Sequence, residues 1–235
     1  MRVLIACEES QTECKAFRAH GIEAYSCDVQ KPSGGRPEWH ILGDALQAMR
    51  GGQITTMDGQ VHDIPGWDLM IAHPPCTYLS NAGAVNLRKH GVLNMDRMAK
   101  AIDAKKFFMA CLEAPIPHIC VENPIPGRIH QLPPYSQIVQ PYMFGDEWQK
   151  TTCLWLRNLP VLMATDIVVP RGKWVESTPH GKNPESWSVK GHKGSKIRSK
   201  SFPGMARAMA EQWGGKNNET QNICEAAHGA WRVQK

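Results

Sequence analysis

A single cysteine stands where a short apolar segment meets two prolines. Residues 69–72 (Leu-Met-Ile-Ala) predict a buried strand, and Pro74-Pro75 ends it in a rigid turn that presents Cys76. Each proline fixes its own φ, and Pro75 also excludes helical geometry for the residue before it. The sulfur is therefore held in one place, as a nucleophile requires. A packed core cysteine is the plainer alternative, because free cysteines are often simply buried.

A second apolar segment delivers a carboxyl group and an amide. Residues 119–122 predict another short strand, and Glu122 and Asn123 stand at its end, directly before a proline. If both strands belong to one parallel sheet, they release their last residues at the same edge, where open α/β sheets bind ligands. A thiol and a carboxyl facing one pocket suit chemistry on an electron-poor ring. The thiolate can add to a ring carbon while the carboxyl handles a ring nitrogen.

Such a parallel pair needs a crossover, and residues 97–114 predict the helix that supplies it. The residues expected on its buried face are Ile102, Phe107, Phe108, Met109 and Leu112. Further helices are predicted over 11–20 and 204–213, and further strands over 3–6, 24–28 and 153–156, with a weaker one over 137–142. This alternation of strands and helices indicates the α/β class.

Pro74-Pro75-Cys76 followed by Glu122-Asn123 resembles the DNA cytosine-5 methyltransferases, whose signatures are a Pro-Cys nucleophile loop and a Glu-Asn strand end. The resemblance runs in order from Met1 to about Trp213. It implies a three-layer α/β sandwich of the S-adenosylmethionine-dependent, Rossmann-like methyltransferase type. It also implies that Cys76 adds to C6 of a cytosine, that Glu122 hydrogen-bonds or protonates N3, and that Asn123 orients the turn that carries Glu122.

The same resemblance implies S-adenosylmethionine as the cofactor. The acid that ends the second strand, Asp28, would bind the ribose, and Asp44 in Leu42-Gly-Asp44 would lie near the adenine. Ser201-Phe-Pro203 looks like the start of the family's last motif, which closes the cofactor pocket. The cofactor-binding residues that we expect are Ala6, Cys7, Glu8, Asp28, Asp44, His73, Pro74, Ser201 and Phe202.

Three features depart from the family pattern. Residues 7–12 (Cys-Glu-Glu-Ser-Gln-Thr) replace the glycine-rich loop, so the freedom of glycine to adopt positive φ is missing there. The family's Gln-x-Arg-x-Arg strand corresponds to Gln149, Thr151 and Cys153, so both of its arginines are gone. Only residues 161–200 stand where the family inserts a target-recognition domain.

The segment from Arg171 to Lys200 concentrates positive charge, with eight Lys and Arg residues against two Glu residues. Basic groups neutralise phosphates and interleaved aromatic faces stack on bases, so we expect this segment to bind nucleic acid. A solvated lysine-rich loop is the alternative. The nucleic-acid contacts that we expect are Arg88, Gln149, Lys173, Trp187, Lys190, Lys193, Lys196 and Arg198.

The whole chain has 235 residues and a formal charge of +5. We expect a catalytic α/β core over 1–160, a short basic insertion over 161–200, a returning helix over 201–215 and a loosely held tail over 216–235. No run of about eighteen apolar residues predicts a membrane span. Eight cysteines without a Cys-x-x-Cys pair indicate a reducing compartment and no metal site. We expect a cytoplasmic monomer.

The function that these residues favour is transfer of a methyl group to C5 of cytosine in DNA, with the base flipped out or supplied single-stranded. Two alternatives stay open: the same thiol chemistry on a free pyrimidine nucleotide or an RNA, and an inactive DNA-binding protein of this fold. The nucleophile needs a depressed pKa, which a helix N-terminus or a nearby cation such as Arg88 could provide for Cys76.

Overall fold

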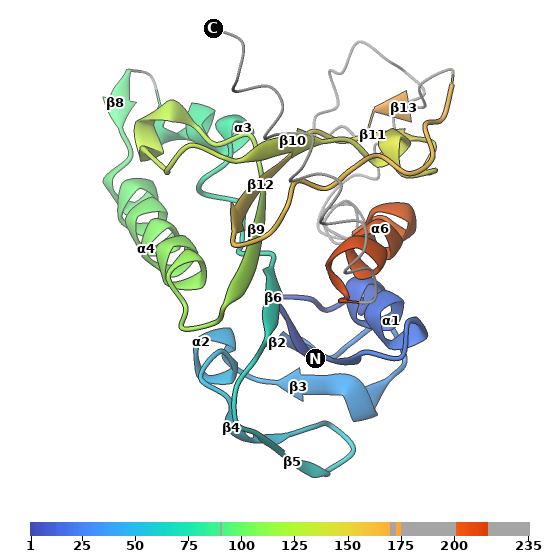
Figure 1. Cartoon of the computed structure of the whole chain (residues 1–235). Coiled ribbons are helices and arrows are strands. Elements are labelled where there is room, and N and C mark those ends of the chain that lie inside the picture. Colours follow the sequence, from blue (N-terminus) through green and yellow to red (C-terminus); the bar gives the residue numbers. More distant parts are fainter. Residues whose placement is uncertain (90, 170–172, 175–200, 216–235) are drawn as a thin grey trace, which may run out of the picture.

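The structure is a computed structural model that describes residues 1–89, 91–169, 173–174 and 201–215. Its centre is one seven-stranded sheet (Figure 1). In spatial order the strands are β10 (Gln137–Val139), β12 (Thr152–Arg157), β9 (His118–Pro124), β6 (Leu69–Ala72), β1 (Arg2–Ala6), β2 (Glu23–Asp28) and β3 (His40–Leu42).

Five neighbouring strands, from β9 to β3, run parallel, whereas β12 runs antiparallel to both β9 and β10. The parallel strands define two ends of the sheet. We call the end where β1, β2 and β6 finish the carboxyl edge, and the end where they begin the amino edge. The predicted parallel pairing of 69–72 with 119–122 is confirmed, since Ala72 lies opposite Val121.

Helices cover both faces of this sheet. The helices are α1 (Thr12–Ala19), α2 (Ala45–Ala48), α3 (Asn81–Ala84), α4 (Met95–Leu112) and α6 (Pro203–Trp213), with 3-10 turns η1 (Pro37–Trp39), η2 (Val85–Leu87), η3 (Arg128–His130) and η4 (Pro141–Met143). Figure 1 shows α2 and α4 on one side of the sheet and α1 and α6 on the other. The described part of the chain is thus a three-layer α/β sandwich.

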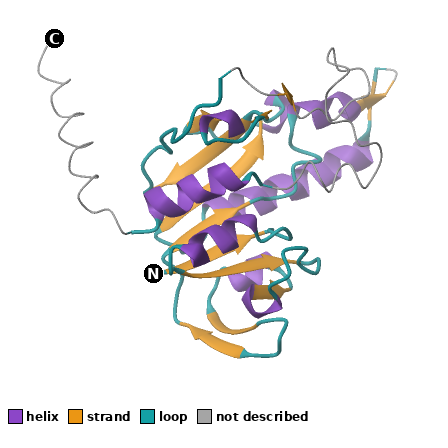
Figure 2. Cartoon of the chain, turned by 90° about the vertical axis from the view of Figure 1, so that its right-hand side faces the viewer, coloured by secondary structure: helices purple, strands orange, loops and turns teal. Residues whose placement is uncertain are grey.

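Three small sheets surround this core. They are β4 (Gly52–Thr55) with β5 (Val61–Ile64), β7 (Arg88–Lys89) with β8 (Val92–Leu93), and β11 (Trp148–Gln149) with β13 (Lys173–Trp174). Figures 1 and 2 place the β4–β5 hairpin below the main sheet. None of these short pairs was predicted from the sequence, because two-stranded ribbons carry little apolar periodicity.

Two apolar layers form the core, one on each face of the sheet. One layer packs Phe108 and Cys111 of α4 against β1, β2, β6 and β9, and the other packs Phe17 of α1 and Met205 of α6 against the opposite face. The predicted helix over 97–114 therefore exists. Its predicted buried face is wrong at Ile102, which is 50% exposed, because small Ala101 turns toward the sheet instead.

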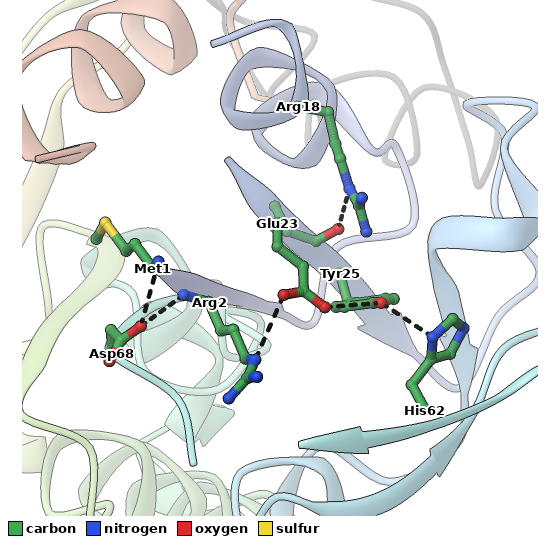
Figure 3. Close-up of polar contacts among 8 residues, drawn as sticks. Met1, Arg2, Arg18, Glu23, Tyr25, His62 and Asp68 are labelled. Atoms are coloured by element: carbon green, nitrogen blue, oxygen red, sulfur yellow. Dashed lines mark hydrogen bonds and ion pairs between the residues drawn. The ribbon is translucent and has the colours of Figure 1, made fainter. Parts of the chain in front are cut away.

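The amino edge is tied together by exposed polar contacts, which Figure 3 shows. The backbone N–H of Arg2 donates to Asp68 (2.6 Å), and the Arg2 guanidinium lies 3.3 Å from Glu23. The Tyr25 hydroxyl bridges Glu23 and His62, at 3.2 Å from each. These contacts join β1, β2 and the β4–β5 hairpin, far from the ends of the strands that carry the candidate chemistry.

The last described helix, α6, closes the face of the sheet that α1 covers only in part. Pro203 occupies its first turn, where a missing N–H costs nothing. Gly204 lets the helix start directly against β10 and η4, because a Cβ at this position would lie 2.0 Å from the Phe144 carbonyl oxygen. The Gly204 N–H donates to Asp146 (3.0 Å), which fixes the entry of the helix.

Candidate active site

The loop after β6 holds Cys76 at the carboxyl edge. Its carbonyl accepts the N–H groups of Leu79 and Ser80 at 3.1 and 3.0 Å, so the chain folds into a turn directly behind the cysteine. The amide of Asn123 at the end of β9 lies 3.5 Å from the Pro74 carbonyl, a long hydrogen bond between the two strand ends. Asn123 thus links β9 to the cysteine turn.

Arg97 of α4 clamps the same loop, which sequence reasoning did not anticipate. Its guanidinium donates to the carbonyls of Thr77 (3.0 Å) and Gly83 (3.0 Å) and lies 5.0 Å from the centre of the Tyr78 ring. Gly83 allows the tight packing, because a Cβ there would lie 2.4 Å from the Thr77 carbonyl oxygen. The predicted crossover helix therefore positions the thiol in addition to linking the strands.

Glu122 meets an unexpected partner. His73 follows β6 directly, and its Nδ1 lies 2.9 Å from a Glu122 carboxylate oxygen. The other ring nitrogen, Nε2, lies 3.3 Å from a carboxylate oxygen of Glu13 in the first turn of α1. The Glu13 side chain is fully buried and that of Glu122 is 8% exposed. Three segments distant in sequence thus build one carboxylate–imidazole–carboxylate row.

The charges in this row follow from burial and contact. Burial by itself would lower the pKa of His73, but Glu13 and Glu122 on its two sides raise that pKa to about 9. Burial would likewise raise the pKa of Glu122, yet His73 and Lys150 outweigh it and hold the pKa at about 2. Near neutral pH His73 is therefore an imidazolium beside an ionised Glu122.

The cation that lowers the pKa of the nucleophile is Lys150. Burial raises the pKa of the Cys76 thiol, and the positive charge of Lys150 opposes that rise. Arg88 instead lies on the exposed strand β7 and donates to the Gly91 carbonyl (3.1 Å). Arg88, one of the groups that the sequence offered for lowering the pKa of Cys76, is not among those that affect it here. Lys150 lies one position after Gln149, in the segment where the family carries its arginines, and its Nζ lies 5.6 Å from the Phe202 ring centre.

Three of the residues expected to bind the cofactor lie together at the carboxyl edge. Asp28 ends β2, whereas Cys7 follows β1 and Asp44 follows β3. Their side chains are close enough to interact electrostatically. Cys7 has φ +61°, so this loop reaches the left-handed conformation without the missing glycine. One Asp28 oxygen accepts from the Gln30 N–H (2.8 Å), and Asp44 caps α2 by accepting from the Leu46 N–H (2.9 Å).

The Glu8 side chain is buried in the protein interior. It is 3% exposed, and its carboxylate accepts the backbone N–H groups of Glu13 (2.7 Å) and Cys14 (3.4 Å) at the start of α1. A carboxylate at a helix N-terminus satisfies donors that have no partner within the helix. The structure thus gives Glu8 a capping role in place of the expected cofactor contact.

The other expected residues lie as follows. Ala6 ends β1, and its carbonyl accepts the His73 N–H (2.9 Å). Ser201 and Phe202 lie partly buried at the start of α6, and Gln149 lies on β11. Lys173 belongs to β13, while Trp187, Lys190, Lys193, Lys196 and Arg198 lie outside the described residues. Most of the predicted basic insertion is therefore not placed relative to Cys76.

Two surface hollows flank the outer side of α1 and not Cys76. One of about 630 Å³ is lined by Lys15, Arg18, Ala19, Arg36 and Trp39. The other, of about 390 Å³, is lined by Ser10, Thr12, Lys15, Ala16 and Pro203. We place the chemistry at the carboxyl edge because the convergent titratable groups lie there, whereas these hollows are open surface.

Comparison with known proteins gives little more. No family model and no curated protein matches this chain. A solved structure described as a putative DNA modification methyltransferase, encoded within an E. coli prophage, is similar with a TM-score of 0.42 and 12% identity. The likeness covers 72% of this chain and about half (52%) of that one. A likeness this distant identifies neither a family nor an activity.

Among the described residues, no helix combines the length and apolar character needed to span a membrane.

Proposed function

We propose that this protein transfers a methyl group from S-adenosylmethionine to C5 of cytosine in DNA. The observation that carries the proposal is the meeting of Cys76, Glu122 and Asn123 at one edge of one sheet. The strand order of the sheet also supports it, because an antiparallel strand inserted beside the last strand of a parallel sheet is the arrangement of Rossmann-like methyltransferases.

The residues present fit the cofactor. Two carboxylates, Asp28 and Asp44, stand at the ends of neighbouring parallel strands, where hydroxyl and amino groups of a nucleoside would find acceptors. The left-handed backbone at Cys7 preserves the sharp turn after β1. When bound, S-adenosylmethionine supplies the methyl group that C5 receives. Ala6, Cys7, Asp28, Asp44, His73, Pro74, Ser201 and Phe202 are the residues that we propose to surround it.

The chain's own groups perform the remaining steps. The Cys76 thiolate adds to C6 of the base, and the displaced ring electrons move to N3, where Glu122 donates a proton or a hydrogen bond. Loss of the C5 proton later restores the ring and expels Cys76. Lys150 favours the thiolate electrostatically. The Arg171–Lys200 segment is the proposed contact to DNA phosphates, and the target base must leave the duplex stack.

The experiment is methyl transfer measured side by side on DNA, RNA and free cytidine nucleotide. We expect DNA to be methylated, and an oligonucleotide with 5-fluorocytosine to trap the protein covalently because fluorine blocks the last elimination. The Cys76→Ser variant should lose turnover by about 10³-fold or more, the scale for removing a nucleophile. Cys14→Ser is the matched control, since a hydroxyl can keep the bond of Cys14 to the Ala24 carbonyl. Full activity of Cys76→Ser would disprove the mechanism.

A further inference from the structure

The side chains of Glu13, His73 and Glu122 form a row that leads toward Cys76. Glu122 faces Nδ1 of the imidazole and Glu13 faces Nε2, so the two carboxylates lie on opposite sides of one ring. Each residue comes from a different element, namely α1, the turn after β6, and β9. A ring with an acceptor at each nitrogen can pass a proton from one side to the other. The end of the row at Glu122 is the end that lies near Cys76.

Glu13 has few partners for a buried carboxyl group, namely His73 and the neighbouring Glu8. Its side chain is fully buried, and neither carboxylate oxygen accepts a hydrogen bond from the described residues. The contact to His73 is the one ion pair that Glu13 makes within the described chain. A buried carboxylate with one cationic partner is costly to keep, and such groups gather at functional sites.

A divalent metal is the rival explanation, because one oxygen or nitrogen from each of the three residues lies within 4.8 Å of the others. A metal ion binds only one nitrogen of a given histidine. Here each carboxylate faces its own nitrogen, so a single ion could not meet both carboxylates and keep these contacts. A bound ion would also coordinate the Glu122 carboxylate, which must be free to act on N3 of the base in the proposed methyl transfer. The geometry therefore favours a row that carries protons.

We infer that Glu13 and His73 form a proton relay that supplies Glu122 during addition of Cys76 to the base. This inference rests on the proposed function. His73 and Glu13 are positioning residues, since neither touches the base in this scheme. The negative charge of Glu13, 3.3 Å from Nε2, favours a proton on that nitrogen and leaves Nδ1 as the nitrogen that gives up its proton.

The proton balance is closed. As the Cys76 sulfur bonds to C6, an electron pair reaches N3, and N3 takes up a proton. That proton leaves Nδ1 of the imidazolium and passes through the Glu122 carboxylate to N3, so Glu122 is ionised before and after the transfer. His73 becomes a neutral imidazole whose remaining proton is on Nε2, the nitrogen that lies 3.3 Å from Glu13. When N3 later releases its proton, Glu122 returns it to His73. No oxidant or further reactant is needed.

The groups that face the relay come from every element around it. Glu13 and Glu8 approach from α1 and the loop before it, Glu122 from β9, and Lys150 from the segment before β12. Burial and the neighbouring Glu13 raise the pKa of Glu8 well above its ordinary value. Lys150 opposes protonation of His73, and the two carboxylates outweigh it.

The first test needs no activity. An NMR titration of the histidines in the full chain should find His73 with a midpoint near 9 instead of 6.5. Glu13→Gln should move that midpoint down by at least one unit, while the control Glu23→Gln on the amino edge should leave it unchanged. A wild-type midpoint at or below 6.5 would overturn the relay, even if Glu13→Gln failed to fold.

The second test reads the relay in the reaction. The rate of covalent trapping by 5-fluorocytosine DNA should decline above the pKa of His73, and in Glu13→Gln this decline should begin at lower pH. The rate should fall about 10- to 100-fold, below the full contribution of a general acid, because Glu122 remains. The dissociation constant of S-adenosylmethionine should not change. A rate profile identical to wild type would contradict the relay.

The outcomes separate the possible failures. If wild type neither traps nor methylates while His73 titrates near 9, the proposed function fails and the charged row stands. A third measurement addresses the rival: Zn²⁺ is titrated by calorimetry into chelator-treated wild type and Glu13→Gln. Weak binding that is equal in the two supports the relay. Tight stoichiometric binding lost in Glu13→Gln, together with activity that needs the metal, would overturn it in favour of a metal site.

Discussion

The two ends of the central sheet treat charge in opposite ways. At the amino edge, Arg2 and Glu23 form a pair whose side chains are 39% and 42% exposed, and the chain's first amino group lies 3.9 Å from Asp68. At the carboxyl edge, Glu13 and Glu122 are buried around His73. Exposed pairs are screened by water and contribute little, whereas buried charges depend on each other.

This difference indicates which charged contacts the protein could lose with little change in stability. At the amino edge, charged side chains join the first residues of strands that apolar packing already holds together. The carboxyl edge keeps titratable groups buried against one another, and the proposed relay gives that arrangement a use. The four predictions below test that contrast, beginning with the largest expected effect.

His73→Ala should lower the free energy of unfolding by about 3–5 kcal/mol, the scale for breaking a buried pair and leaving its partner uncompensated. Urea denaturation near neutral pH measures the loss. The control is His118→Ala, an exposed histidine on the amino edge whose Nδ1 lies 3.0 Å from the Asp68 carbonyl. Its loss should stay below about 1 kcal/mol. Equal losses in the two variants would show that the buried charges of the carboxyl edge contribute no more to stability than the exposed contacts of the amino edge.

Stability should fall by roughly a few kcal/mol as the pH rises from about 6.5 through 9. The pKa of His73 is raised on folding, so its contribution is complete below 6.5 and disappears as the pH passes about 9. Glu8, whose pKa is also raised, acts in the same direction. On the acid side, the lowered pKa of Glu122 gives a contribution that is complete above 4.5 and disappears toward pH 2.

Denaturation midpoints measured from pH 6 to pH 10 check this dependence, and the His73→Ala variant should show a flatter curve. A wild-type stability that stays constant between pH 6.5 and 9 would mean that His73 is not held as an imidazolium.

Asp28→Ala should weaken S-adenosylmethionine binding by about 1–3 kcal/mol, because the ribose hydroxyl would lose its hydrogen-bond acceptor. Isothermal calorimetry measures the change. Asp68→Ala is the matched control, an aspartate at the opposite end of the sheet that accepts from the Arg2 N–H. Unaltered affinity of Asp28→Ala would show that the acid ending β2 is not the ribose contact.

Arg2→Ala should change the free energy of unfolding by less than about 1 kcal/mol, and the change should shrink further at high salt. Denaturation in low and high salt measures both effects. A loss as large as that of His73→Ala would show that the amino edge is as interdependent as the carboxyl edge.

Local sequence patterns predicted the strands and helices that carry strong periodicity. Residues 69–72 and 119–122 are apolar and bounded by proline, so their strands and the shared edge of Cys76 and Glu122 followed directly. Ile102 was misplaced because helical spacing alone does not say which side of a helix a small residue such as Ala101 turns toward the sheet. The short strand β3 was missed because its three residues carry too little pattern.

The partners of Glu122 could not be predicted in the same way. His73 stands in the nucleophile loop, but nothing local says that Glu13, sixty residues earlier, lies on its far side. That contact depends on how α1 sits against the sheet, which Glu8 fixes by capping it. Lys150 likewise acts on Cys76 only because β12, which begins two residues after Lys150, returns beside β9. No local signal marked Glu13, because the predicted helix over 11–20 also carries Lys15 and Arg18 and a glutamate in its first turn is ordinary.

The packing of α6 on α1 has a consequence for the order in which the protein is made. Every strand of the main sheet leaves the ribosome before residues 203–213 do. Until then the face formed by Val3, Ile5 and Phe17 lacks the cover that Met205 and Met209 later provide. A nascent chain therefore carries an exposed apolar strip through most of its synthesis. Exposed apolar surface of this kind favours aggregation until the last helix packs onto it.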